Sequence, residues 1–273
     1  MSDFRAARLI AVRAKIAAIE AGARRDSESL PFGDARIDGC LPGGGLPLGR
    51  WHEIVSPGME VETAAAPAAF TALMAAPLAA RGEVVWVLRR DDLWAPGLAG
   101  LGFPPEKLIC VCARDEAEAL SVMEDALATV GVSAVIGETE AVDLTAGRRL
   151  QLSCEKHAAT GFLIRRRPFG GSPRREAGGS AACTRWSVSS APSEPPAGEF
   201  GLGAPRFEAR LERCRGGQTG AWLMEAPDAY EWGAYEWGAY ELEVKDGAHP
   251  LRLVAELADR QLAPAQPARR TAA

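Results

Sequence analysis

The chain has 273 residues, of which 47% are hydrophobic and 25% are charged, and its formal net charge is −5 at pH 7. This composition is typical of a soluble globular protein with one large core. The negative net charge excludes binding of polyanions through overall charge, so a nucleic-acid surface would have to be a local patch. No run of about 18 apolar residues predicts a membrane span. The N-terminus lacks the apolar segment of a secretory signal, and we expect a cytoplasmic protein.

The first 48 residues predict a helix followed by a loop. Over residues 4–22, Leu9, Val12, Ile16 and Ile19 lie three or four positions apart and form one apolar stripe. This helix either packs on the core with a solvated basic face or serves as a partner-binding arm. Residues 23–48 are rich in Gly, Pro, Asp and Ser, which predicts a loop.

Short apolar runs then alternate with helical patterns. We expect strands over 50–55, 83–88, 107–112, 132–137 and 161–166, with helices ending near 80 and over 92–101, 114–130 and 143–158. Such alternation is typical of βαβ units around a parallel sheet. Cys110 and Cys112 lie in the third apolar run, and we expect two thiols on one face of a buried strand. No cysteine pair has the CxxC spacing of a zinc site.

The pattern changes after residue 167. Residues 168–183 are rich in Gly, Ser and Arg and predict a loop, and residues 184–190 alternate as a strand does. Residues 206–214 and 220–226 predict an antiparallel pair joined through 215–219.

A five-residue repeat follows. The unit AYEWG occurs at 229–233 and 234–238, and AYELE comes next. Its aromatic residues are Tyr230, Trp232, Tyr235, Trp237 and Tyr240. Exposed Tyr and Trp are enriched where partners bind, so the repeat is a candidate docking segment. The alternative is a duplication in a surface loop.

Motif order over about residues 35–225 resembles the RecA ATPase core. The segment LPGGGLPLGRWHEIVSPGMEVET has the Gly-rich approach, P-x-G-R turn, strand ending in E-I and phosphate loop of that family. GVSAVIGE resembles its Walker B strand, and GFLIRRRPFGG resembles the strand before its second DNA-binding loop. The resemblance implies an α/β, RecA-like fold. Its central sheet would be mostly parallel and flanked by helices, with antiparallel strands toward the C-terminal end.

On this basis we expect four parts in the chain. They are an N-terminal helix or arm (1–30), a RecA-like core (31–226), an aromatic, partner-binding segment (227–261) and a disordered tail (262–273).

The phosphate loop departs from the family pattern. A functional loop reads GxxxxGK[ST], and its lysine reaches the β- and γ-phosphates. Here the second glycine is replaced by Val61 and the lysine by Glu62. Unit charges about 4 Å apart interact by about 1–4 kcal/mol near a protein surface or in water, and Glu62 turns that attraction into repulsion. The degenerate loop comprises Ser56, Pro57, Gly58, Val61, Glu62 and Thr63. The alternative is a simple strand-to-helix turn, with Ser56 or Thr63 as N-cap.

Three further ATPase positions are altered. The resemblance places the catalytic glutamate near Arg90, the Walker B acid near Gly137 with Glu138 beside it, and the γ-phosphate sensor near Arg166. We therefore expect a pseudo-ATPase that is not an enzyme, with no nucleotide cofactor and no metal.

Six arginines surround the 168–183 loop, and the only acidic residue among them in the sequence is Glu176. They are Arg165, Arg166, Arg167, Arg174, Arg175 and Arg185. Guanidinium groups bind phosphates in a bidentate manner without reading base sequence, so DNA is one candidate ligand. An acidic protein partner and a solubilising run of charge are the alternatives.

A short RecA-like chain with a degenerate phosphate loop and an N-terminal helix resembles the ImuA group of inducible-mutagenesis proteins, also described as SulA-like. Its members are encoded with ImuB, a catalytically inactive relative of Y-family polymerases, and with an alternative C-family DNA polymerase. The resemblance implies a non-catalytic adaptor for these proteins, and for RecA, in error-prone translesion synthesis during the SOS response. An ATP-dependent recombinase paralogue and a SulA-like cell-division inhibitor stay open as alternatives.

Overall fold

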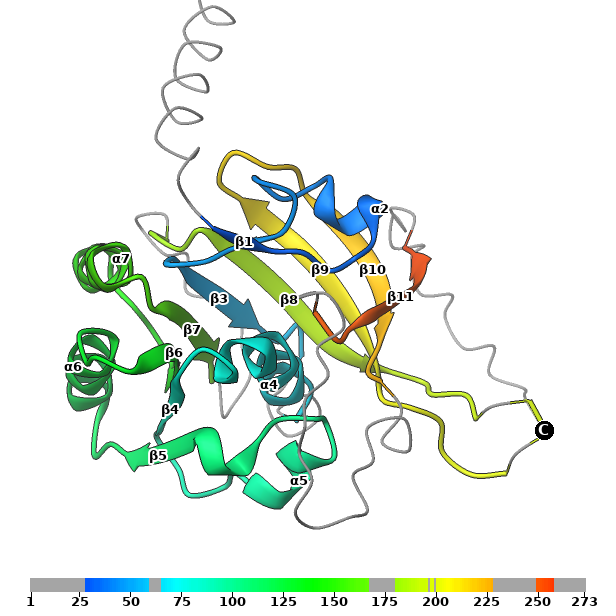
Figure 1. Cartoon of the computed structure of the whole chain (residues 1–273), viewed down its shortest axis with the longest axis horizontal. Coiled ribbons are helices and arrows are strands. Elements are labelled where there is room, and N and C mark those ends of the chain that lie inside the picture. Colours follow the sequence, from blue (N-terminus) through cyan, green and yellow to red (C-terminus); the bar gives the residue numbers. More distant parts are fainter. Residues whose placement is uncertain are drawn as a thin grey trace, which may run out of the picture.

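The computed structural model describes residues 28–58, 65–166, 180–195, 197–198, 200–227 and 249–257. They form a nine-stranded sheet with the order β11-β10-β9-β8-β3-β7-β6-β4-β5 (Figure 1). Its strands are β3 (Trp51–Val55), β4 (Glu83–Leu88), β5 (Leu108–Cys112), β6 (Val132–Thr139), β7 (Thr160–Arg165), β8 (Thr184–Ala191), β9 (Arg206–Cys214), β10 (Gly220–Glu225) and β11 (Arg252–Glu256).

The mode of strand pairing changes once across this sheet. All neighbours from β5 to β8 pair in parallel, whereas β8, β9, β10 and β11 pair antiparallel. The expected RecA-like class, mostly parallel with antiparallel strands toward the C-terminal end, is therefore confirmed.

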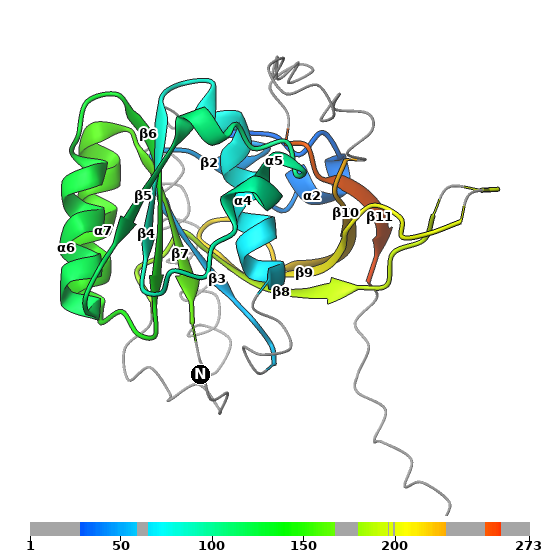
Figure 2. The same cartoon turned by 90° about the horizontal axis from the view of Figure 1, so that it is seen from below.

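Helices cover both faces of the parallel strands (Figure 2). One face carries α4 (Ala65–Ala79) and the short α5 (Ala95–Ala99), and the other carries α6 (Glu116–Leu127) and α7 (Leu144–His157). The last two helices begin at N-caps of the favoured type, because Asp115 accepts from the Glu118 amide and Asp143 from the Ala146 amide. A short 3₁₀ turn (Pro105–Lys107) leads into β5.

Each of the parallel strands β3, β4, β5, β6 and β7 contributes to two separate cores. In β4, Val84, Trp86 and Leu88 pack on the α4 side, while Val85 and Val87 pack on the side of α6 and α7. Successive side chains of a strand point to opposite faces, so a strand buried on both faces is apolar throughout. This explains the continuous apolar runs in the sequence.

The antiparallel strands curl around α4 (Figure 2). Phe70 of α4 contacts Trp186 of β8 and Phe207 of β9 at ring-centroid distances of 5.8 Å each. Trp186 in turn lies 6.0 Å from Trp222 of β10. These buried aromatic rings join the parallel and antiparallel parts into one core.

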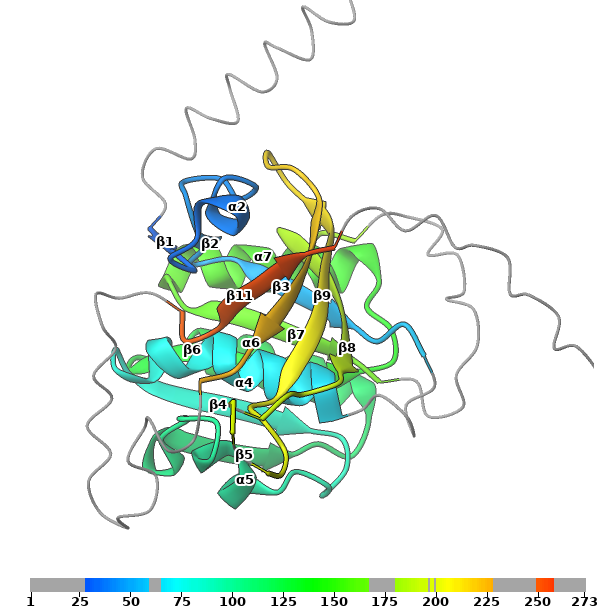
Figure 3. The same cartoon turned by 90° about the vertical axis from the view of Figure 1, so that its right-hand side faces the viewer.

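The prediction of a loop over residues 23–48 is wrong in part. Residues 28–48 contain β1 (Ser29–Leu30), α2 (Ala35–Asp38) and β2 (Leu46–Pro47), with β1 and β2 paired antiparallel. Figure 3 shows α2, β1 and β2 together beside the β9–β10 turn, where the Gln218 amide donates to the Cys40 carbonyl at 2.8 Å. Ile37 and Leu46 are fully buried. Gly and Pro mark turns in this segment, but its scattered apolar residues have no helix or strand period and still fill the core.

Two further findings differ from the sequence analysis. β11 is an unexpected strand, so the sheet takes in residues beyond 226. The prediction that Cys110 and Cys112 lie in a buried strand is wrong, because both thiols are exposed. β5 is the edge strand of the sheet, and neither face of it is fully covered.

Candidate functional site

The carboxyl ends of β3, β4, β6 and β7 meet at one edge of the sheet, which is where open α/β folds bind ligands. Ser56, Pro57 and Gly58 follow β3 at this edge. Val61, Glu62 and Thr63 lie outside the described residues, and α4 begins soon after them at Ala65. The structure therefore places the first half of the degenerate phosphate loop and its neighbours.

The position expected for the Walker B acid is closed by packing. A β-carbon on Gly137 would overlap the Sδ, Cε and Cγ atoms of Met123 in α6. Met123 is itself 1% exposed, so its side chain has little room to move. A side chain at residue 137, including a metal-binding carboxylate, would therefore require the buried Met123 side chain to move.

Glu138 is the next residue of β6, and its side chain lies on the opposite face. It is buried, and its carboxylate accepts from the indole Nε1 of Trp86 at 3.2 Å and from Nε of Arg166 at 3.1 Å. Burial raises the pKa of Glu138, and the positive charge of Arg166 opposes that rise. Glu138 is therefore a buried carboxylate whose ionised form depends on Arg166.

Arg166 also binds Asp92, in the segment that follows β4. Its Nη2 donates to both carboxylate oxygens of Asp92 at 2.6 Å, and its side chain is only 12% exposed. The residue at the expected γ-phosphate sensor position thus joins the ends of β4, β6 and β7 through two carboxylates. A phosphate at this guanidinium would have to compete with both of them.

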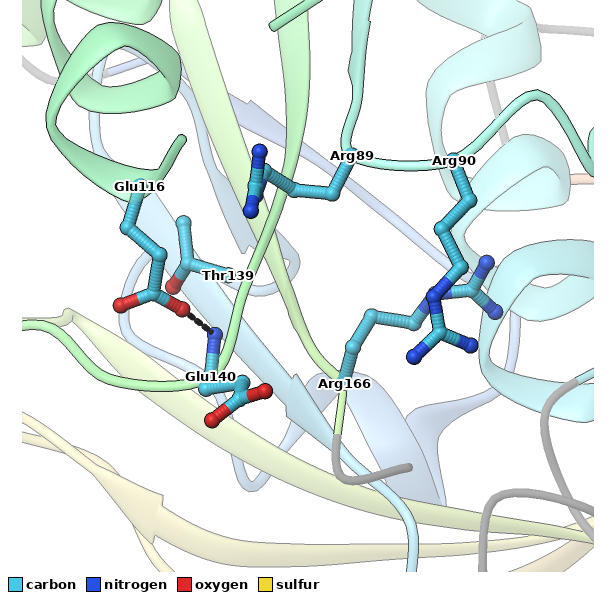
Figure 4. Close-up of a pocket in the computed structure, with 6 residues that line it drawn as sticks. All are labelled: Arg89, Arg90, Glu116, Thr139, Glu140 and Arg166. Carbon is cyan, nitrogen blue, oxygen red and sulfur yellow. Dashed lines mark hydrogen bonds between the residues drawn. The ribbon is translucent and has the colours of Figure 1, made fainter. Parts of the chain in front are cut away.

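A cavity of about 210 Å³ lies next to this ion-pair group. Its lining residues are Arg89, Arg90, Glu116, Thr139, Glu140 and Arg166 (Figure 4). Arg89 donates to the Ala113 carbonyl at 2.9 Å, and Glu116 accepts from the Glu140 amide. Figure 4 shows the Arg90 and Arg166 side chains together on one side, away from the two glutamates. The cavity therefore has an acidic side and a basic side, and it is not a purely cationic phosphate site.

A second ion-pair group is centred on β3, the strand that leads into the phosphate loop. Glu53 of β3 is 0% exposed and accepts from Arg165 Nη1 at 2.7 Å and from Arg185 Nε at 2.9 Å. Burial favours a raised pKa for Glu53, but hydrogen bonds from Arg185 and Ser180 and the charges of Arg185 and Arg165 outweigh it and hold the pKa below its ordinary value. Glu53 therefore stays ionised and binds β7 and β8 to β3.

These contacts change the interpretation of the arginine cluster. Arg165, Arg166 and Arg185 each have a carboxylate partner from a distant part of the chain, in addition to Glu176, the only acid that lies among them in the sequence. Sequence order could not show this, because parallel strands bring distant residues together. The missed signal is Glu53 itself, since a carboxylate within a buried apolar strand requires a basic partner.

Sequence similarity to known proteins shows the family of this chain. Protein ImuA of Caulobacter vibrioides strain NA1000 / CB15N is 52% identical over 257 residues, covering 92% of this chain and 99% of that protein. The same holds for Protein ImuA of strain ATCC 19089 / CIP 103742 / CB 15. The chain belongs to the ImuA family. No protein-family model matches it.

Among solved structures, this ImuA-family chain is similar to the crystal structure of the RadB recombinase. The TM-score is 0.49 at 16% sequence identity, and the match covers 73% of this chain and 97% of the recombinase chain.

The remaining candidate residues of this ImuA-family protein lie outside the described parts. They are Arg167, Arg174 and Arg175 of the arginine cluster, Tyr230, Trp232, Tyr235, Trp237 and Tyr240 of the repeat, and the 4–22 helix. Both ends of the connection that carries the repeat are placed, however. The Ala226 amide donates to the Pro205 carbonyl and the His249 amide to the Pro31 carbonyl, each at 2.8 Å.

The described residues contain neither a metal-binding cluster nor a membrane-spanning helix. No group of three or more His, Cys, Asp or Glu side chains within them could hold a metal ion. None of the helices among these residues has the length and apolar character needed to cross a membrane.

Proposed function

We propose that this ImuA-family protein is a non-catalytic accessory protein of DNA-damage-induced, error-prone translesion synthesis in the cytoplasm. In this role it is an adaptor that holds an ImuB-type inactive polymerase and an alternative C-family polymerase. Family membership supports the setting, and the state of the nucleotide edge supports a non-catalytic role.

One observation carries the pseudo-ATPase part of the proposal. Arg166, at the expected sensor position, is bonded to Glu138 and Asp92. An ATPase needs open carboxylates for metal and water at such an edge. Here Glu138 and Asp92 are paired with Arg166 within the protein, and Met123 fills the side of Gly137 where a metal-binding acid would project.

Equilibrium binding of a fluorescent ATP analogue with Mg²⁺ tests this part. We expect no saturable binding up to millimolar analogue and no phosphate release above a protein-free control. A RecA protein measured in parallel shows that the assay detects a functional site. Micromolar affinity for the analogue would overturn the pseudo-ATPase assignment.

The adaptor part rests on partner contacts through the protein surface. The candidates are the segment 227–261 for the ImuB-type protein and the 4–22 helix for RecA. Co-purification of the full chain with each purified partner tests them separately. Recovery of neither partner would contradict the adaptor role, whatever the result with ATP.

A further inference from the structure

The connection between β8 and β9, residues 192–205, holds two large apolar side chains in water. The relative exposure of Phe200 is 104% and that of Leu202 is 95%. Figures 1 and 2 show the connection projecting beyond the end of the sheet. Neither side chain therefore contributes to the core, and both are available to another molecule.

The base of this projection is fixed to the sheet. A β-carbon on Gly203 would overlap the Glu194 carbonyl, so the two sides of the connection are in contact there. Arg206 pairs with Glu194 at 3.2 Å and with Glu225 of β10 at 2.6 Å. β8 and β9 remain paired up to Ala191 and Arg206. The apolar tip is thus carried on a defined support.

The prolines of the connection reduce the conformational entropy that is lost when it binds a partner. Residues 192–205 include four prolines, at positions 192, 195, 196 and 205. Proline fixes its own φ angle and lowers the conformational entropy that a segment loses when it becomes ordered. Single exposed apolar residues are ordinary, but two on a supported tip are typical of a docking element.

Charge selects the kind of partner. Residues 192–205 contain no lysine or arginine, and Glu199 stands next to Phe200 in the sequence, whereas Glu194 at the base is paired with Arg206. Nucleic acid and anionic lipid are bound through basic residues, so neither fits this tip. An apolar groove on a protein, with basic residues at its rim, fits the two apolar side chains and the acid next to Phe200.

The last residue of the connection, Pro205, lies beside the start of the segment assigned to partner binding. The Ala226 amide, just before residue 227, donates to the Pro205 carbonyl at 2.8 Å, and Glu225 is paired with Arg206 across the strands. Both segments therefore leave the sheet at the same end, within reach of one partner.

We propose that the β8–β9 connection is a docking loop whose Phe200 and Leu202 enter an apolar, basic-rimmed groove of the ImuB-type partner. This inference rests on the proposed adaptor function and adds a second contact to it.

Binding of the full chain to the purified ImuB-type protein of the same organism, measured by biolayer interferometry, tests the docking loop. The double variant Phe200→Ala/Leu202→Ala should raise Kd about ten-fold or more, because hot-spot side chains each contribute strongly when buried. Its melting temperature should match that of the wild type, since the two side chains are exposed. The matched control is Val130→Ala, which removes an apolar side chain with 98% exposure from the turn before β6 and should leave Kd unchanged.

The outcomes separate the two proposals. If the wild-type chain does not bind the ImuB-type protein, the adaptor function and the docking loop are both overturned. If the wild type binds and the double variant binds equally well, only the docking loop is overturned. Self-association that is lost in the double variant, seen by light scattering with partner binding unchanged, would also overturn it in favour of contact between two copies.

Discussion

At the scale of single residues, two buried glutamates at the edge of the same sheet behave in opposite ways. Glu53 has two arginine partners and a lowered pKa, whereas Glu138 shares Arg166 with Asp92 and has a raised pKa. Burial acts on both carboxylates, and the number of positive neighbours decides the direction of the shift.

Replacement of Glu53 by glutamine should strongly destabilise the protein. The variant Glu53→Gln leaves the buried guanidinium of Arg165 without its carboxylate, and breaking a buried pair in this way costs about 3–5 kcal/mol. Urea denaturation at neutral pH measures the loss. The control is Glu118→Gln on α6, which removes the carboxylate partner of the exposed Arg114 and should change stability little. Equal losses in the two variants would contradict a structural role for the Glu53 group.

The pH dependence of the two glutamine variants should differ in sign. A lowered pKa means that Glu53 stabilises the fold above its ordinary value of 4.5 and that this contribution is lost as pH falls through the lowered value. A raised pKa means that Glu138 contributes most below 4.5 and loses that contribution as pH rises through the raised value. Relative to the wild type, Glu53→Gln should therefore become worse as pH rises from below 4.5 to about 5, and Glu138→Gln should become better as pH rises from about 4.5 to 7. Trends of the same sign in the urea midpoints of the two variants would show that one of the two directions is wrong.

At the scale of elements, the C-terminal strand joins the core although a long connection precedes it. Leu251 is 1% exposed and belongs to the α4-side core. His249 packs on Phe32 at a centroid distance of 4.3 Å, and burial lowers the pKa of His249 to about 3, so its ring stays neutral. Residues 249–257 are thus held by packing as well as by pairing with β10.

Truncation of Leu251 should reveal this packing. Leu251→Ala removes a buried side chain and should cost about 2–5 kcal/mol of folding free energy. Val254→Ala in β11, whose side chain is 40% exposed, should cost much less. Denaturant midpoints compare the two variants, and a neutral Leu251→Ala would mean that β11 is not part of the folding unit.

Shortening of the aromatic repeat should leave the fold intact. Deletion of residues 229–238 removes two AYEWG units from the connection between β10 and β11, and loop-closure entropy changes by only a few tenths of a kcal/mol for such a reduction. The thermal midpoint should stay close to that of the wild type, while affinity for the ImuB-type protein should fall. A folded deletion variant with full affinity would remove the repeat from the list of partner contacts.

At the scale of the whole molecule, the core has a RecA-like sheet, and at the carboxyl ends of its parallel strands Arg166 is bonded to Glu138 and Asp92 while Met123 packs against Gly137. Loss of the phosphate-loop lysine is therefore one of several changes, and its reversal alone should not restore activity. We predict that Val61→Gly/Glu62→Lys yields a folded protein without ATP turnover, because Met123 still fills the space beside Gly137 and Arg166 stays bonded to Glu138 and Asp92. A phosphate-release assay checks this, and multiple turnover by the double variant would show that the loop alone had limited activity.

The sequence by itself determined the order of strands and helices, because apolar runs and N-caps are local signals. It predicted β4 (Glu83–Leu88) and β9 (Arg206–Cys214) with their observed bounds, and the motif order indicated the fold class. It could not assign β11, a five-residue edge strand whose sequence, RLVAE, has no alternation of polar and apolar residues, nor the exposure of Cys110, which depends on β5 being last in the sheet. Only the tertiary structure paired Glu53 with Arg165 and Arg185 and brought Glu138, Arg166 and Asp92 together. These groups lie up to 132 residues apart, and parallel pairing, which no local pattern encodes, decides which of them meet.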